Sequence, residues 1–378
     1  MANASTIGMV SADSHVNEPR DLWSSNLPPH MLDIAMRGIE ARDDGGWELI
    51  FDGRHMAVGA TTDDERLAVN DPTHRLEVMR SEGIAGECIF PTIGLYVWML
   101  TDPDGGRISC RIYNEWIADQ LQRHSDRFKC AGLVPTWRVD DALAEIEFIA
   151  GSGLGAIMMP AVVEPTYNHS AWEPVWSAAA ETGLPVVMHQ GTGHNMIWYR
   201  GPGATVANLL STQTIGPRTA TMLATSGVLA RHPGLHVVFV EFNAGWLAWT
   251  MNTIDYYNVA FEPLTTETSG SAALAGRDKP PRSIIYPELP EPPSYYIRRQ
   301  VHATFQDDAV ALHNLDLTGT DCVMWGSDYP HHEGTYPHSR ESVDRLSERL
   351  DDDTTRAVFR DNAARVFNFD PRVLAATV

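Results

Sequence analysis

An acidic residue and a histidine stand two positions apart at the end of the first apolar run of the chain, residues 9–15. Side chains i and i+2 of a β-strand point to the same face, so Asp13 and His15 would present a carboxylate and an imidazole side by side. Both groups ligate divalent cations, and both can carry protons. The spacing therefore predicts two members of a metal or acid–base site at the end of a first strand.

Three later apolar runs end in the same way. Residues 185–189 end at His189, residues 235–241 at Glu241 and residues 322–328 at Asp328. A single histidine at a strand end is more often a hydrogen-bonded core residue than a ligand. Such endings on four separate runs instead favour one shared site for a metal ion or for proton transfer. Nitrogen and carboxylate donors without a thiolate suit zinc, and equally manganese or iron.

Strand-like runs alternate with helix-like segments along the chain, and this order predicts how the four endings meet. We count eight such strands, the pattern that is typical of a (β/α)8 barrel. Functional side chains of these barrels lie at the C-terminal ends of the strands, where all four endings fall. A doubly wound open sheet would need a G-x-G-x-x-G turn after the first strand, and Asp13-Ser14-His15 stands there instead.

Two segments depart from this alternation. Residues 40–65 contain Asp52-Gly53 between apolar runs, which predicts a small β-hairpin inserted after the first strand. Residues 265–298 are rich in Pro, Gly and Ser and predict a long insertion before the seventh strand. Barrels of roughly 200 to over 400 residues fold as single units, so we expect one domain over residues 1–378.

Charge and composition narrow the classes of function. The formal net charge of −21 disfavours nucleic acids and anionic membranes as partners, because both are polyanions. No run approaches the ~18 uncharged apolar residues of a membrane span, and the first residues do not resemble a signal peptide, so we expect a cytoplasmic protein. The four cysteines form no C-x-x-C pair, which favours buried thiols over disulfides or a thiolate zinc site.

Four phrases of the sequence resemble one family. They are Ala12-Asp13-Ser14-His15-Val16-x-Glu18-Pro19, Leu184-Pro185-Val186-Val187-Met188-His189-x-Gly191, Trp325-Gly326-Ser327-Asp328-Tyr329-Pro330-His331 and Asn362-Ala363-Ala364-Arg365. The chain is similar there to the amidohydrolase-related, metal-dependent barrel proteins, a group that includes aminocarboxymuconate-semialdehyde and γ-resorcylate decarboxylases alongside hydrolases. The resemblance extends from about residue 10 to residue 369. It implies a barrel fold, a single divalent metal and an enzymatic role.

The resemblance also assigns roles to single positions. Asp13 and His15 match the family's first-strand H-x-H or E-x-H pair, His189 its fifth-strand histidine, and Asp328 an aspartate that is a ligand, a proton carrier or both. Two positions depart from the family pattern. The first ligand is an aspartate, which adds negative charge and should change the metal preference. On the sixth strand Glu241 stands where many relatives have a histidine.

These assignments define the expected site. We expect one divalent ion per chain, zinc before manganese or iron, bound by Asp13, His15, His189 and Asp328. The residues expected to act in catalysis are Asp328, Glu241 and His189. Further contacts to a planar substrate are expected from loop residues, because aromatic walls with a few polar groups suit a small planar molecule. These loop residues are Trp98, His194, Trp198, Arg200 and His331.

Two chemistries fit the expected site. In a hydrolase the metal activates a water molecule and Asp328 accepts its proton. In a decarboxylase the metal chelates a carboxylate, and Asp328 or a nearby acid protonates the carbon as carbon dioxide leaves. Because Glu241 would repel a substrate carboxylate, we favour hydrolysis of a small aromatic or cyclic amide or ester, with decarboxylation of an aromatic or muconate-like acid as the alternative. A barrel that binds a ligand without turnover is a third, disfavoured hypothesis.

A homodimer is implied by the resemblance. Two apolar clusters near the long insertion point the same way, because a lone barrel would leave them poorly covered. These clusters are residues 284–286 and residues 295–297.

Overall fold

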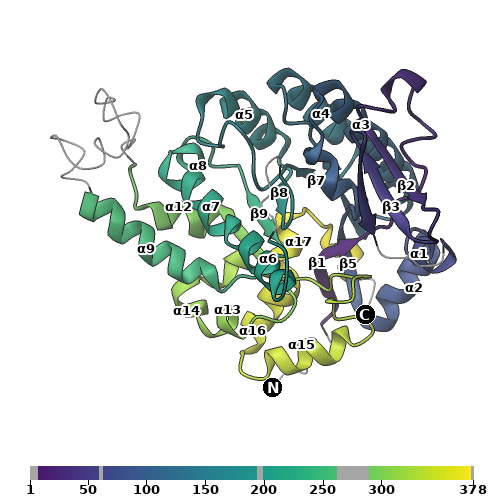
Figure 1. The fold of residues 1–378 in the computed structure, drawn as a ribbon. Helices are drawn as coiled ribbons and strands as arrows, with labels where there is room; N and C mark the ends of the chain where they lie inside the picture. The colour runs from purple at the N-terminus through teal and green to yellow at the C-terminus, as the bar shows by residue number, and fades with distance from the viewer. Residues whose placement is uncertain (1–6, 59–62, 194–198, 262–288, 376–378) are drawn as a thin grey trace, which may run out of the picture.

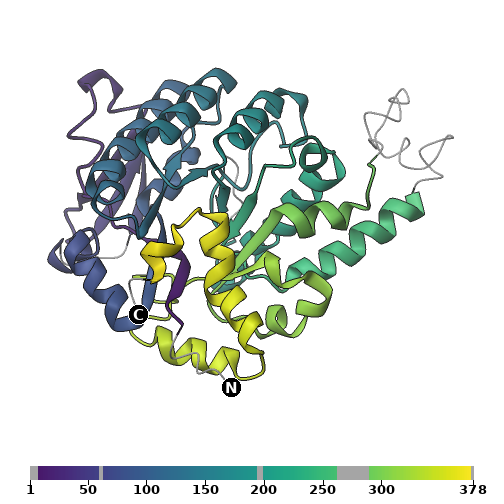
Figure 2. The same ribbon diagram turned by 180° about the vertical axis from the view of Figure 1, so that it is seen from behind.

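Eight parallel strands form the centre of the fold, in the order β1-β5-β6-β7-β8-β9-β10-β11. The structure, a computed structural model, describes residues 7–58, 63–193, 199–261 and 289–375. The strands and the surrounding helices form a nearly closed barrel, which confirms the predicted fold class (Figures 1 and 2). The strands are β1 (Met9–His15), β5 (Ile84–Phe90), β6 (Phe128–Leu133), β7 (Ala156–Met158), β8 (Val186–His189), β9 (Val237–Val240), β10 (Val301–Phe305) and β11 (Val323–Trp325).

Helices pack around the outside of these strands. Both faces of the strands are therefore covered; all seven residues of β1 and of β5 are buried, as is usual for a parallel sheet. The helices of the first half are α1 (Asp63–Ala68), α2 (Pro72–Glu82), α3 (Pro103–Gln120), α4 (Val139–Ser152) and α5 (Glu173–Thr182). Those of the second half are α6 (Ala204–Gln213), α7 (Ile215–Thr225), α8 (Val228–Arg231), α9 (Trp246–Phe261), α12 (Pro293–Gln300), α13 (Ala309–His313), α14 (Leu315–Thr318), α15 (Ser339–Ser347), α16 (Asp352–Arg356), α17 (Asn362–Val366) and α18 (Pro371–Ala375).

The first and last strands approach each other through few contacts. An isolated parallel bridge pairs Ser14 with Tyr329, and the N–H of Asp328 donates to the carbonyl of Asp13 over 2.8 Å. Gly326 permits this approach, because a Cβ at that position would lie 2.4 Å from the Cβ of Asp13. The seam between β1 and β11 therefore places the first and last predicted site residues side by side.

Buried hydroxyl groups fill the same seam. The Oγ of Ser11 lies 3.0 Å from the Oγ of Ser327 and 3.2 Å from the Oγ of Ser14. The backbone N–H of Ser327 also donates to the Oγ of Ser11 over 2.8 Å. All three serines are fully buried, so their mutual hydrogen bonds satisfy groups that water does not reach.

A three-stranded antiparallel sheet follows β1 and contains the predicted hairpin. Its strands are β2 (Met36–Ala41), β3 (Trp47–Phe51) and β4 (Arg54–Val58). The chain turns between β3 and β4 at Asp52 and Gly53, whose φ angles of 53° and 65° suit a two-residue hairpin turn. The sheet begins before the predicted range, because β2 pairs with β3 from Met36 opposite Phe51 onward.

The long insertion predicted over residues 265–298 lies largely outside the described residues, as does the cluster 284–286. Its described end contains the start of α12, where Tyr296 is 3% exposed and Ile297 is fully buried. The expectation that the cluster 295–297 is poorly covered is therefore wrong for Tyr296 and Ile297, which pack into the same apolar core as the barrel strands, whereas Tyr295 is 43% exposed. Within the described ranges no helix is both long and apolar enough to cross a membrane.

Candidate metal centre

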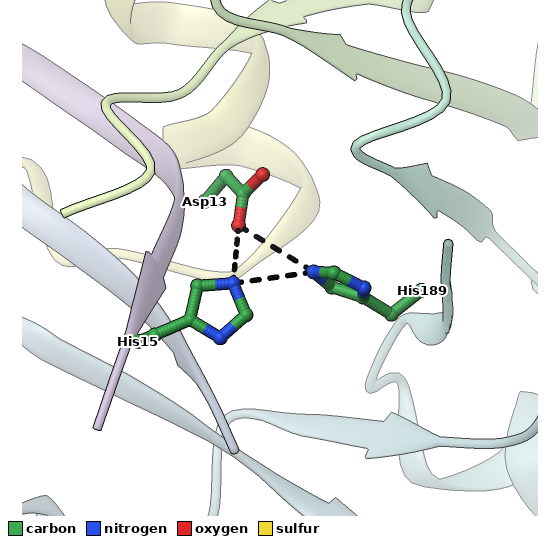
Figure 3. Close-up of side chains that lie close together, drawn as sticks. All are labelled: Asp13, His15 and His189. Carbon is green, nitrogen blue, oxygen red and sulfur yellow. Dashed lines mark hydrogen bonds and ion pairs between the residues drawn. The ribbon is translucent and has the colours of Figure 1, made fainter. Parts of the chain in front are cut away.

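Two histidines from different strands face each other at the C-terminal end of the barrel (Figure 3). His15 closes β1 and His189 closes β8, and their Nε2 atoms lie 3.2 Å apart. Each ring turns its other nitrogen to a backbone carbonyl: Nδ1 of His15 donates to Pro91 and Nδ1 of His189 donates to Gln190, both over 2.8 Å. A carbonyl only accepts, so the neutral rings carry their proton on Nδ1. Two Nε2 lone pairs are thus left facing each other.

Three carboxylates surround these lone pairs. One oxygen of Asp13, Oδ1, lies 3.4 Å from Nε2 of His15 and 4.0 Å from Nε2 of His189. Asp328 Oδ1 lies 3.5 Å from the first of these nitrogens, and Glu241 Oε2 lies 3.3 Å from the second. Ligand atoms bound at zinc-like distances in a tetrahedral site are about 3.4 Å apart. The spacing of the donor atoms of Asp13, His15 and His189 therefore matches the geometry around one shared cation.

Carboxylate oxygens of this cluster lack hydrogen-bond donors. Asp13 and Asp328 are fully buried. Gln306 donates to Oδ2 of Asp13 over 3.2 Å, but Asp13 Oδ1 and Asp328 Oδ2 accept no hydrogen bond from the residues that the structure describes. Leaving an unpaired charge buried costs several kcal/mol. A proton would satisfy one such atom, whereas a cation would satisfy the carboxylates and both imidazoles together, so these residues fit a divalent metal ion.

The imidazoles are held in the neutral form that binds metals. Burial, followed by the charges of His331 and His189, keeps the pKa of His15 well below its usual value. Burial lowers the pKa of His189 to about 4, although the hydrogen bond to Gln190 opposes the shift. Near pH 7 neither ring carries a second proton, so neither Nε2 lone pair is blocked.

The acids show the opposite effect. Burial, followed by the negative charges of Asp328 and Glu241, raises the pKa of Asp13 well above its usual value. Burial and the charges of Asp328 and Glu333 do the same for Glu241. A bound divalent cation would oppose these shifts, because it favours ionised carboxylates. Binding of a metal ion would therefore release protons from these carboxyl groups.

The loop after β11 adds two residues. The ring of His331 lies against that of His15, with centroids 4.0 Å apart and planes tilted by 30°, and its Nδ1 lies 2.9 Å from Oδ1 of Asp328. Burial lowers the pKa of His331, but its contact with Asp328 and the charge of Glu333 outweigh that effect and raise it. One oxygen each of Glu241, Asp328 and Glu333 fall within 4.8 Å of one another. Glu333 was not predicted from the sequence; its only signal was a place close after Asp328 in the same loop.

The backbone at two strand ends is in the left-handed region. Glu241 has φ 66° and Asp328 has φ 55°, which costs a residue with a Cβ roughly 1 kcal/mol or more. The N–H of Glu241 donates to Oγ1 of Thr304 over 2.8 Å, and that of Asp328 donates to Asp13, so hydrogen bonds hold both conformations. Strain retained in this way is typical of functional positions.

The predicted site residues fall into three groups. The structure brings together Asp13, His15, His189, Glu241, Asp328 and His331. Trp98 is fully buried and donates its indole N–H to Val134, whereas Arg200 is exposed. His194 and Trp198 lie outside the described residues. Substrate contacts by these last four residues stay predictions.

A family model described as amidohydrolase matches residues 12–369, a range that includes every residue of this centre. The chain belongs to the amidohydrolase family. This amidohydrolase is therefore an enzyme of a metal-dependent family, and its barrel carries a possible metal site at the expected strand ends. A comparison with curated protein sequences found no match.

Solved structures of similar fold include a further amidohydrolase and two decarboxylases. The amidohydrolase from Mycobacterium avium subsp. paratuberculosis K-10 has a TM-score of 0.73 and 17% identity over 96% of this chain and 99% of its own. The 5-carboxyvanillate decarboxylase from Sphingomonas paucimobilis has a TM-score of 0.64 and 20% identity over 97% and 100%. A dihydroxybenzoic acid decarboxylase from Polaromonas sp. JS666, with bound manganese and the inhibitor 2-nitroresorcinol, has a TM-score of 0.62 and 14% identity over 96% and 97%. At identities this low, the TM-scores establish a shared fold alone.

Proposed function

We propose that this amidohydrolase-family enzyme removes the carboxyl group of a small aromatic or muconate-like acid as carbon dioxide, with the help of one divalent cation. The observation that carries the proposal is Asp328, a fully buried carboxyl group beside His15 that has an oxygen without a donor. Burial favours the neutral acid, which is the form that can give a proton to carbon. Decarboxylases of the same fold, which act on 5-carboxyvanillate and dihydroxybenzoate, support this choice over hydrolysis.

The residues of the centre have different roles in this reaction. Asp13, His15 and His189 would hold the cation, which supplies positive charge for binding the substrate carboxylate and a neighbouring oxygen. Asp328 protonates the carbon that loses its carboxyl group, while the electron pair of the broken C–C bond stays on that carbon. His331, whose Nδ1 is 2.9 Å from Asp328 and whose side chain is 23% exposed, is placed to return a proton from solvent.

The donor set also bears on the metal. Two imidazoles and one carboxylate suit zinc and manganese alike, and a decarboxylase of the same fold contains manganese. We propose one such ion per chain. Elemental analysis of the purified protein checks the identity and the number, and protein that holds no metal and gains no activity from added Zn²⁺ or Mn²⁺ contradicts the proposal.

Isotope labelling tests the reaction. With hydroxylated benzoic acids or muconate-like acids in deuterated water, we expect one deuterium at the carbon that lost the carboxyl group and an equal amount of carbon dioxide. Solvent oxygen labelled with ¹⁸O should not enter the product. Incorporation of one labelled oxygen into a product acid from an amide or ester, without carbon dioxide, would refute decarboxylation.

Hydrolysis of a neutral amide or ester is the second candidate, and one observation favours it. Glu241, Asp328 and Glu333 converge beside the centre. Each would repel a substrate carboxylate by about 1 to 4 kcal/mol at ~4 Å between water-like and surface-like screening. A neutral substrate does not experience this repulsion. In that reaction Asp328 would accept a proton from the attacking water.

We also propose a homodimer, joined through the outer face of α9. Trp249, Tyr256 and Val259 of this helix are 64%, 67% and 68% exposed, and Leu317 of the adjoining α14 is 61% exposed. Copies with a net charge of −21 repel each other least through a face with few charges. Light scattering that gives the monomer mass of 41.8 kDa at micromolar concentration would contradict the dimer.

A further inference from the structure

Glu18 is a fully buried carboxylate shortly after His15 in the chain. Its Oε2 accepts the N–H of Ile93 over 2.9 Å, and its Oε1 accepts the N–H of Gly94 over 2.8 Å. These two N–H groups open the short 3-10 helix Ile93–Met99, for which Thr92 provides no side-chain cap. Glu18, in the loop after β1, therefore caps this 3-10 helix. Each of its two carboxylate oxygens accepts one of the N–H groups.

The segment that Glu18 holds, residues 91–94, contacts two imidazoles of the centre. The carbonyl of Pro91 accepts the Nδ1–H of His15 over 2.8 Å. The Oγ1 of Thr92 lies 3.3 Å from Nε2 of His331. Both contacts depend on where the segment 91–94 lies, because it belongs to the loop after β5 and not to the strands that carry these histidines.

The segment has little room to move. A Cβ at Gly94 would lie 2.8 Å from the Cβ of Pro91 and 3.2 Å from Oε1 of Glu18. The backbone therefore packs directly against the carboxylate, and only the length and the two acceptor oxygens of glutamate match the two N–H groups.

We propose that Glu18 is a positioning residue for the metal centre. By fixing the segment 91–94, it keeps the carbonyl of Pro91 against His15, so that His15 carries its proton on Nδ1 and directs its Nε2 lone pair at the cation. The same segment steadies His331 beside Asp328. The inference rests on the proposed metal centre, but it is independent of whether that centre decarboxylates or hydrolyses.

A matched control lies on the other side of the barrel. Oδ2 of Asp308 accepts the N–H groups of Ala244 and Gly245, each over 2.8 Å, in the loop after β9. Asp308 is also buried, at 8% exposure. Asp308 also binds two successive amides of the neighbouring loop, although through one oxygen, while its Oδ1 accepts the N–H of Ala311 over 2.9 Å. It holds neither Pro91 nor Thr92.

The test compares Glu18→Gln with Asp308→Asn. Each variant keeps its size but places an amide NH₂ where a carboxylate oxygen faced a backbone N–H. We expect Glu18→Gln to weaken Mn²⁺ or Zn²⁺ binding about tenfold, the lower end for groups that orient a metal ligand. We expect Asp308→Asn to stay within about twofold of wild type. Binding is measured by competition with a chromophoric chelator, without substrate.

A second readout reports the tautomer directly. In metal-free protein with ¹⁵N-labelled histidine, the ring nitrogens of His15 should show the Nδ1–H form in wild type and in Asp308→Asn, and a mixture in Glu18→Gln. Unchanged metal affinity and tautomer in Glu18→Gln would overturn the proposal. Equal weakening in both variants would overturn it too, because it would reveal general loosening of the loops.

A substitution at Gly94 provides a second test in case the Glu18→Gln protein does not fold. Gly94→Ala adds a methyl group against Pro91 and Glu18 and displaces the segment 91–94 while leaving the carboxylate in place. It should weaken metal binding in the same way. Wild-type affinity in folded Gly94→Ala protein would show that the position of this segment does not matter, and so would contradict the proposed role of Glu18.

Discussion

Two histidine pairs lie at opposite ends of the same barrel, and their hydrogen bonds differ. At the N-terminal ends of the strands, Nδ1 of His236 lies 3.0 Å from Nε2 of His302, and Nδ1 of His302 lies 3.0 Å from the carbonyl of Asp321. In both of these hydrogen bonds an N–H meets an acceptor. At the C-terminal ends His15 and His189 give both of their protons to backbone carbonyls, so that two acceptors meet.

The charges near the two histidine pairs also differ in sign. Burial lowers the pKa of His236, and the positive charges of Arg365 and Arg299 lower it further. Carboxylates surround the other pair instead. Two close imidazoles are therefore not by themselves a metal site. The positions of their protons and the sign of the neighbouring charges separate a structural pair from a metal-binding one.

The largest expected effect comes from removing one ligand. His15→Ala or His189→Ala should reduce bound metal from about one ion per chain to almost none. Because a catalytic cation is worth several kcal/mol, kcat/KM should fall roughly a thousandfold or more. His302→Gln, in the structural pair, should keep its metal. Elemental analysis and steady-state kinetics check both expectations, and loss of metal from His302→Gln would remove the distinction between the pairs.

Asp328→Asn sharpens the comparison within the centre. The amide keeps the shape of the side chain but neither gives nor takes the proton, so we expect turnover to fall about 10²- to 10⁴-fold with much of the metal retained. Metal content and single-turnover rates are measured on the same preparation. Metal loss as complete as that of His15→Ala would identify Asp328 mainly as a ligand.

Removing the metal should lower the thermal stability of the wild-type protein. It should not change the stability of a variant that lacks the metal site. A cation present at about 100 times its dissociation constant stabilises the folded state by about 2.7 kcal/mol. For a domain of this size we expect chelation to lower the melting temperature by about 3 °C. Calorimetry of His189→Ala with and without chelator serves as the control, and an equal shift there would place the stabilising ion elsewhere.

The smallest effect concerns the structural pair and pH. Burial, with the charges of His236 and Arg365, lowers the pKa of His302 to about 3. The unfolded chain binds a proton near pH 6.5 and the folded chain does not, so His302 stabilises the fold above pH 6.5 and loses this contribution as pH falls toward 3. The stability difference between wild type and His302→Gln should shrink by up to about 1.4 kcal/mol per pH unit below 6.5. Urea unfolding of metal-free protein at pH 7, 6 and 5 measures it; a constant difference would contradict the low pKa.

Strand periodicity predicted much of this centre. The i, i+2 spacing of Asp13 and His15 and the apolar runs before His189, Glu241 and Asp328 are local signals, and a parallel barrel brings their ends together. The same signals identified all eight strands.

Other features depend on loops, whose conformation the periodicity does not encode. Glu18 was visible only as part of a family phrase, and its contact with the amides of Ile93 and Gly94 depends on how two loops pack. A carboxylate oxygen of Glu333 lies within 4.8 Å of one of Glu241 only because of the conformation of the loop after β11. The proton positions on the histidines follow from the carbonyls of Pro91 and Gln190, which no sequence pattern marks.

The seam between β1 and β11 sets the order in which the centre can assemble. Ser11 and Ser327 share a hydrogen bond although they are 316 positions apart, and Asp13 and Asp328 meet beside them. During synthesis on the ribosome, Asp13 emerges early and Asp328 emerges almost last. We therefore expect Asp328, the proposed proton donor, to join the ligands only after the final strand has docked, so that a nascent chain can bind its cation before it can turn over substrate.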